Sequence, residues 1–178
     1  KTTISSVADQ VTNTHYQGNY NGGKAGLDYY FSKKDVAGFV LSGNFNDNTQ
    51  DPYGDSYIRD NTGKVLYKLS SLGQNGRSSS NMSSNFNYKH TFDSTGTELT
   101  ADLDYIHYNN KSNNQITTQS FDAENVKTAN DVILKGSIPS IVNIYSAKAD
   151  YVHPFKKGLK LEAGIKSSYV NTDNIVDY

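Results

Sequence analysis

Residues 144–169 contain two runs of alternating apolar and polar residues, separated by a short connection. The second run changes character at every step: Leu159, Lys160, Leu161, Glu162, Ala163, Gly164, Ile165 and Lys166. A period of two is typical of a β-strand, because successive side chains point to opposite faces. The connection at residues 156–158 (Lys-Lys-Gly) contains a glycine, so the whole stretch predicts a β-hairpin.

The same alternation recurs in four earlier stretches: 25–32, 37–45, 81–92 and 99–107. Together with the hairpin they predict an all-β fold, an antiparallel meander of about six long strands. A weak internal repeat supports this interpretation. Leu-Asp-Tyr at residues 27–29 and 103–105, and Ala-Asp-Tyr at 149–151, each place a carboxylate on one face beside a tyrosine on the other.

The predicted connections alternate between short and long. Short turns are expected at residues 33–35, 93–96 and 156–158. The polar stretches 46–81 and 109–140 are expected to be long loops, the first with a small hairpin turning at Asn-Thr-Gly, residues 61–63. Residues 1–21 are also expected to be a loop. Short turns on one side and long loops on the other are the pattern of outer-membrane barrels, with periplasmic turns and extracellular loops.

Each predicted strand has an apolar face and a charged face. The apolar positions are expected to face lipid: Leu27, Phe39, Leu41, Phe86, Leu99, Leu103, Ala149, Leu161 and Ile165. The charged positions are expected to line a hydrated lumen: Asp28, Asp102, Asp104, Lys148, Asp150, Lys160, Glu162 and Lys166. Opposite charges on neighbouring strands are expected to pair across the sheet. A half-buried soluble sheet also alternates, so a second observation is needed to distinguish a barrel wall from a soluble sheet.

The aromatic residues provide this second observation, because they lie toward the ends of the apolar runs. We expect them to form the girdles of a barrel: Tyr29, Phe31, Tyr88, Phe92, Tyr105, Tyr151, Phe155 and Tyr169. From Leu161 to Tyr169, about eight residues at a rise of ~3.3 Å and a tilt of ~40° span roughly 20 Å. An apolar band of about that height, bordered by aromatic rings, is what a lipid-facing barrel wall needs.

The composition excludes several other classes of protein. The formal net charge of −1 gives no electrostatic reason to bind nucleic acid, and the absence of cysteine excludes disulfides and thiolate metal sites. Mean hydropathy is −0.68, and no run approaches the ~20 apolar residues of a spanning helix. Barrel strands expose only alternate residues to lipid, so a polar average is compatible with them. The 14 tyrosines suit either a membrane boundary or an extracellular β-module.

The alternating stretches resemble the barrel portion of TonB-dependent receptor-like proteins of the Bacteroidota outer membrane. The matching segments are residues 26–31 (Gly-Leu-Asp-Tyr-Tyr-Phe), 87–96, 98–105, 144–151 and 161–169. The resemblance covers most of residues 22–177 and fades in the predicted loops. It implies a large barrel of about 22 strands filled by a plug domain, located in the bacterial outer membrane and dedicated to energised uptake of a bulky nutrient.

Six strands are too few to close such a barrel. We therefore expect residues 1–178 to be one β-segment of a longer protein, with the plug and remaining strands outside it. The resemblance implies contacts with outer-membrane lipid, with the rest of the barrel and its plug, and with TonB through regions beyond these residues. A surface lipoprotein or a secreted protein is a further candidate partner.

No constellation of catalytic residues is found, and we expect neither enzymatic activity nor a cofactor. The four histidines have no partners at ligand spacing, and Asp47, Asp51 and Asp55 do not match a known calcium loop. We therefore predict no metal site. Tyr53, Tyr57 and Phe121, in the predicted loops, are candidate ligand contacts.

Two alternatives remain open from the residues alone. The chain could be a soluble extracellular β-sandwich that binds glycans, or a structural barrel whose cargo is a protein. The apolar face separates the first from a barrel wall, because a sandwich would cover Leu27, Phe86 and Leu103 with a second sheet.

Overall fold

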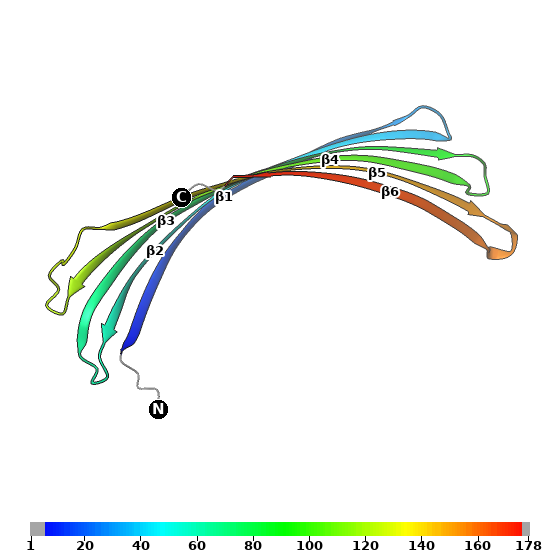
Figure 1. Ribbon diagram of the computed structural model, residues 1–178. Coiled ribbons are helices and arrows are strands. Elements are labelled where there is room, and N and C mark those ends of the chain that lie inside the picture. The colour runs from blue at the N-terminus through cyan, green and yellow to red at the C-terminus, as the bar shows by residue number, and fades with distance from the viewer. Residues whose placement is uncertain (1–5, 176–178) are drawn as a thin grey trace.

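The computed structural model describes residues 6–175, which form six strands in one antiparallel sheet (Figure 1). Neighbours in sequence are neighbours in the sheet, in the order β1-β2-β3-β4-β5-β6. The strands are β1 (Val7–Tyr30), β2 (Asp35–Arg59), β3 (Val65–Thr91), β4 (Glu98–Asp122), β5 (Val132–Pro154) and β6 (Lys160–Asn174), with a 3-10 turn, η1, at Lys156–Gly158. The predicted six-strand meander is confirmed.

The sheet is a single curved and twisted layer, and no other described element covers either face (Figure 1). Within residues 6–175, Ala37 is the one apolar side chain that is buried. Large apolar side chains are instead exposed, among them Leu27 at 65%, Phe86 at 46% and Leu103 at 55%. The described residues contain no helix long and apolar enough to cross a membrane.

The register keeps the predicted faces continuous across all six strands. Residues directly opposite one another form a row, and one such row is Leu27, Phe39, Phe86, Leu103, Ala147 and Ser167. The next row toward the short turns is Tyr29, Ala37, Tyr88, Ala101, Ala149 and Ile165. Opposed residues share a face, so one surface, here called the apolar face, carries all the positions predicted to meet lipid.

The three predicted short turns are confirmed, but the predicted long loops are wrong. Residues 46–81 are not a loop: β2 continues to Arg59 and β3 begins at Val65. Residues 109–140 likewise belong mostly to β4 and β5, with only residues 123–131 between them. Residues 7–21, expected to be a loop apart from the end of a strand near residues 7–11, are all part of β1. Residues 1–5 of that predicted loop lie outside the described residues. Here, polar residues on both faces obscured the strands, because backbone pairing does not require an apolar face.

These polar parts of the strands, residues 7–21, 46–81 and 109–140, form what we call the distal extension. β3 alone has 27 residues, which at ~3.3 Å per residue gives about 90 Å, or about 70 Å along the normal at a tilt of ~40°. A membrane's hydrocarbon core is only ~30 Å thick. More than half of each long strand therefore extends beyond what a membrane could cover.

Three connections are built on an aspartate that holds the turn. Asp93 Oδ1 accepts hydrogen bonds from the Thr95 hydroxyl and backbone N–H, at 2.5 and 2.9 Å. Asp60 Oδ1 makes the same two bonds with Thr62, at 2.6 and 2.8 Å. These bonds, led by that from each threonine hydroxyl, lower the pKa of both aspartates. Both turns share the sequence Asp-x-Thr-Gly, and Asp122 accepts similarly placed N–H bonds from residues 124 and 126.

Candidate functional site: the charged face and its borders

The face opposite the apolar one carries the charges that were predicted to line a lumen. Asp28, Asp102, Lys148 and Lys166 lie in one row of this charged face. Asp104 lies one row toward the distal extension, and the remaining members lie toward the short turns: Asp150, Glu162 and Lys160. The structure therefore brings all eight predicted positions onto one surface, drawn from four different strands.

Amide side chains of β3 lie between the carboxylates of β1 and β4 in the middle of this face. Asn85 Nδ2 donates to Asp104 Oδ1 at 2.7 Å, and Asn87 Nδ2 donates to Asn85 Oδ1 at 3.1 Å. Asp28 and Asn87 lie on either side of Gly38, in the same row. A Cβ on Gly38 would collide with both side chains, so the missing side chain lets the two polar groups approach each other.

The ion pairs of the charged face differ from the cross-strand pairs that were predicted. Lys148 pairs with Asp150, two residues along its own strand, although Asp102 lies directly opposite it. Lys160 and Glu162 also pair within one strand. A lysine stem reaches two residues along a strand as easily as across to the next, so register alone does not select the partner. Lys89 and Glu98 do pair across β3 and β4. All of these pairs are solvated and stabilise the sheet little.

An apolar stripe, which was not predicted from the sequence, interrupts the charged face. Ile106, Ile144 and Val170 lie side by side in one row of β4, β5 and β6. Tyr108 and Val142 form a pair in the next row toward the extension. The signal was present in the sequence, because these apolar residues occupy the polar phase of their strands. On β4 to β6 this face is thus charged near the short turns and apolar toward the extension.

Beyond the stripe, the charged-face side of the distal extension holds an open hollow of about 670 Å³. Its lining includes Tyr16, Gln50, Asn75, Arg77 and Asn114. The Gln50 amide donates to the Tyr16 hydroxyl at 3.3 Å. Sequence reasoning missed this surface because it assigned these residues to three separate loops, whereas the pairing of β1 to β4 places them together.

The predicted ligand contacts do not join that hollow. Tyr53, Tyr57 and Phe121 lie in β2 and β4 and belong to rows of the apolar-face side. The Lys68 ammonium lies 4.5 Å from the centre of the Phe121 ring, and the Arg59 guanidinium lies 5.7 Å from that of Tyr57. The structure therefore brings Tyr57 and Phe121 to one row, around Lys68, and a ligand role for them stays a prediction.

The predicted girdle residues separate into two bands on the apolar-face side. The band near the short turns contains Tyr29, Phe31, Tyr88, Phe92, Tyr151 and Phe155. The other band contains Tyr105 and Tyr169, with Tyr145 between them as a further member that was not predicted. One apolar row, that of Leu27, Phe39, Phe86 and Leu103, lies between the two bands. Other positions predicted to meet lipid lie within the bands: Ala149 and Ile165 share the row of Tyr29 and Tyr88, and Leu41 shares that of Tyr105.

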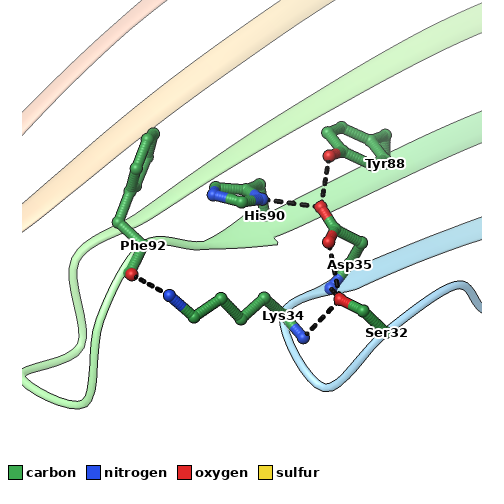
Figure 2. Close-up of polar contacts among 6 residues, drawn as sticks. All are labelled: Ser32, Lys34, Asp35, Tyr88, His90 and Phe92. Carbon is green, nitrogen blue, oxygen red and sulfur yellow. Dashed lines mark hydrogen bonds and ion pairs between the residues drawn. The ribbon is translucent and has the colours of Figure 1, made fainter.

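A polar cluster lies within the first band and ties the β1–β2 turn to β3 (Figure 2). Asp35 Oδ1 accepts a hydrogen bond from the Tyr88 hydroxyl at 2.7 Å and lies 2.6 Å from His90 Nδ1. Its Oδ2 accepts from Ser32 Oγ at 2.6 Å, and Lys34 Nζ donates to the Phe92 carbonyl at 2.7 Å. The sequence placed His90 near a turn but gave no sign of these contacts, which join residues more than 50 positions apart.

The described residues contain no group of three or more histidine, aspartate or glutamate side chains that could hold a metal ion. Asp47, Asp51 and Asp55 share one face of β2, but successive members are four residues apart, or about 13 Å along the strand. That spacing is too wide for one ion.

The model of the outer membrane protein beta-barrel family matches residues 90–178, which is half of the chain. The chain belongs to the outer membrane protein beta-barrel family. Residues 7–89 continue the same sheet as the matched part, with a register shift between β2 and β3 at Ile58 and Arg59. A search among curated proteins found no match.

Membership in the outer membrane protein beta-barrel family places the chain in the bacterial outer membrane, where it forms part of a barrel wall. The uncovered apolar face agrees with this, because Leu27, Phe86 and Leu103 are exposed and residues 6–175 form no second sheet that could pack on them. The alternative of a soluble β-sandwich is therefore wrong.

Proposed function

We propose that this barrel wall belongs to a TonB-dependent outer-membrane transporter that takes up a bulky nutrient. In this proposal the apolar face contacts lipid and the charged face lines the lumen. The transporter has a plug domain and further strands outside these residues, and TonB supplies the energy through them. In this proposal the chain has no catalytic role.

The observation that carries the proposal is the continuity of the charged face with the hollow of the distal extension. Both lie on the same side of β1 to β4, since Asp28 and Tyr16 of β1 share one phase of the strand. A solute held by Tyr16, Asn75 and Arg77 would therefore already be above the lumen. An extension of this length suits capture of a large solute outside the membrane, whereas a simple wall would need only about 10 residues per strand.

The assignment of the two faces can be tested by single-cysteine labelling, and the chain contains no cysteine of its own. Cysteines would replace residues 99–121 of β4 one at a time in the complete protein, in intact outer membranes. A water-soluble maleimide should label the charged-face positions 100, 102 and 104 and spare 99, 101 and 103. Positions 109–121, in the extension, should be labelled on both faces. Equal labelling of Asp102→Cys and Leu103→Cys would contradict the assignment.

Energised uptake can be tested without knowing the solute. Spent medium would be compared by mass spectrometry for the parent bacterium, a strain lacking this gene and a strain lacking its TonB. Both deletion strains should leave the same large solutes unconsumed. Replacing Arg77 and Asn75 with alanine in the hollow should reduce consumption of those solutes, with Lys111→Ala on the other face of the extension as the control. Normal consumption in the gene deletion, or consumption that does not require TonB, would overturn the proposal.

A further inference from the structure

The charged-face side of the distal extension has a polar part and an aliphatic part, carried by different strands. The polar part, here called the amide surface, occupies β2, β3 and β4 and consists of Asn46, Asn48, Gln50, Asn75, Asn110 and Asn114. The aliphatic part, here called the aliphatic strip, runs along β5 and consists of Leu134, Ile138, Val142 and Ile144. Leu134 and Ile138 are 66% and 38% exposed. One face thus offers hydrogen bonds on some strands and an apolar surface on the next.

The two parts adjoin at the hollow of about 670 Å³ described above. Its lining includes Ser112, Asn114 and Ile116 of β4. In the sheet, Ser112 lies directly opposite Ile138, and Ile116 lies opposite Leu134. Neighbouring strands are ~4.8 Å apart, so a solute bound in the hollow against β4 is within reach of the aliphatic strip.

The same combination recurs farther along the wall, where the aliphatic strip joins the apolar stripe of β4 to β6. A smaller hollow of about 180 Å³ lies there, and its lining includes Asn44 and Asn81 of β2 and β3 and Ile106 and Tyr108 of β4. Ile144 of the strip lies directly opposite Ile106. A solute that moves inward from the first hollow would therefore meet amides and aliphatic groups again, in the same arrangement.

Charge on this surface is sparse and of one sign. In the rows from that of Tyr20 to that of Thr12, Arg77 is the one charged side chain on the charged-face side of β1 to β5 as the structure describes them. The aspartates of β2 in this region lie on the opposite side: Asp47, Asp51 and Asp55. A lone guanidinium suits one carboxylate, with which it can form two parallel hydrogen bonds. The surface therefore favours a solute that is neutral or has a single anionic end.

We propose that the solute is an oligopeptide with aliphatic side chains, and that the amide surface, the aliphatic strip and Arg77 together form its binding site. Each peptide unit carries a donor and an acceptor, and the side-chain amides of Asn and Gln can pair with both. Aliphatic side chains of the solute leave water on the strip, and its terminal carboxylate pairs with Arg77. The inference rests on the proposed function, because it names the class of nutrient that the transporter takes up.

The aliphatic strip favours a peptide over a saccharide. The C–H groups of a sugar ring are best matched by the negative face of an aromatic ring, and the strip contains no aromatic residue. The ring of Tyr16, which lines the larger hollow, belongs to β1, whereas the strip belongs to β5. A saccharide would therefore leave the aliphatic strip unused.

The position of the strip favours a solute over a plug domain as its occupant. From Ala147, in the apolar row, to Leu134 the strand spans about 33 Å along the membrane normal, at ~3.3 Å per residue and a tilt of ~40°. The hydrocarbon core is only ~30 Å thick. The outer end of the strip therefore lies outside the membrane, beside the hollow that a solute meets first.

The test uses the complete protein in lipid nanodiscs, with empty nanodiscs as the blank. Fluorescence anisotropy would compare a dye-labelled hexapeptide of alternating serine and leucine with hexaserine carrying the same dye. The leucine peptide should bind at least about tenfold more tightly, because its side chains are buried on the strip. Unlabelled maltohexaose, added as a competitor, should not displace it.

Two sets of variants locate the binding. Leu134→Ser/Ile138→Ser should weaken binding of the leucine peptide at least about fivefold and leave hexaserine unchanged. The matched control is Ile133→Ser/Ile141→Ser, which changes the opposite face of the same strand, where the two side chains are 53% and 36% exposed. Amidation of the peptide's carboxyl end should weaken its binding to the wild type but not to Arg77→Ala. Heat-dependent gel migration checks that each variant is folded.

The outcomes separate the peptide site from transport. Equal affinity for the two peptides, displacement by maltohexaose, or an equal loss in the two double variants would refute the peptide site. Transport is judged by whether consumption of large solutes requires this gene and TonB. Consumption that requires both, with no preference for the leucine peptide, would leave transport standing and remove the peptide. Preference for the leucine peptide without such consumption would keep the binding site and contradict transport.

Discussion

At the scale of single residues, the turns show most directly how the sequence sets the structure. Gly63 and Gly96 follow Asp-x-Thr in their turns and adopt positive φ values of 88° and 96°. A side chain is strained in this region, because its Cβ approaches the backbone carbonyl. The aspartate supplies the hydrogen bonds and the glycine supplies the conformation, so four residues suffice to reverse the chain.

Replacing Gly63 with alanine should destabilise the protein by about 1 kcal/mol, through backbone strain alone. No atom lies within 4 Å of the added Cβ, so packing makes no contribution. Gly76 is the matched control, since its Cβ would also meet open space but no positive φ applies there. Urea unfolding of the refolded protein in detergent would measure both. A destabilisation as large for Gly76→Ala as for Gly63→Ala would contradict the strain argument.

Asp93 should make the β3–β4 turn sensitive to acid. Its folded pKa lies below the ordinary value of 3.8 because the Thr95 hydroxyl hydrogen-bonds to the carboxylate. A lowered folded pKa stabilises the fold above the unfolded value and loses that effect as pH falls through the folded value. The difference in unfolding midpoint between the wild type and Asp93→Asn should therefore be largest near neutral pH and shrink in acid. A difference in midpoint that stays constant with pH would contradict the prediction that ionised Asp93 stabilises the turn.

At the scale of the element, the long polar hairpins are the main departure from what hydropathy suggests. In the distal extension, β2 and β3 pair from Asn46 to Gln50 and from Tyr53 to Arg59, with a register shift only at the end. Most side chains on both surfaces are polar there, and each of these strands still forms backbone hydrogen bonds with its neighbour. Hydrogen bonding of the backbone holds this region, with little apolar burial to help it.

Hydrogen exchange should reveal these strands. Amides of residues 46–59 and 65–81 should exchange slowly in the membrane-embedded protein, whereas residues 123–131, which join β4 to β5, should exchange quickly. Mass spectrometry of peptides would resolve the two. If residues 46–59 exchanged as fast as residues 123–131, the extension would be a set of loops after all.

At the scale of the whole molecule, the sheet cannot be a self-contained globule. β1 and β6 each pair on one side only, so their outer edges carry unpaired backbone groups. The apolar face is equally uncovered. In a barrel, neighbouring strands would pair with the edges and lipid would cover the face.

The isolated 178-residue chain should therefore aggregate in aqueous buffer and require detergent or lipid to stay dispersed. Sedimentation in buffer and in detergent would measure this. A monodisperse monomer without detergent would contradict the barrel-wall assignment, because a soluble protein of this size buries a core, whereas most large apolar side chains here are exposed.

The sequence by itself determined the strands of the wall, their two faces and the short turns. These follow from local properties, since alternation along one strand fixes which side chains share a surface, and Asp, Thr and Gly fix a turn within four residues. Alternation alone predicts Leu27, Phe86 and Leu103 on one surface and Asp28, Asp102 and Lys148 on the other, and the structure has this arrangement.

Only the tertiary structure decided which residues meet across strands. The small hairpin turning at residues 61–63 was predicted from the sequence and is confirmed, but the pairing of residues 46–55 with 70–79 depends on the backbone of the neighbouring strand and was not predicted. Lys148 pairs with Asp150 and not with Asp102, although both carboxylates are within reach of the flexible lysine side chain, so the strand sequence alone does not select the partner. The contacts among Tyr105, Tyr145 and Tyr169 likewise depend on the register of three neighbouring strands. Contacts between distant segments depend on register and side-chain reach, and neither is a local property of the chain.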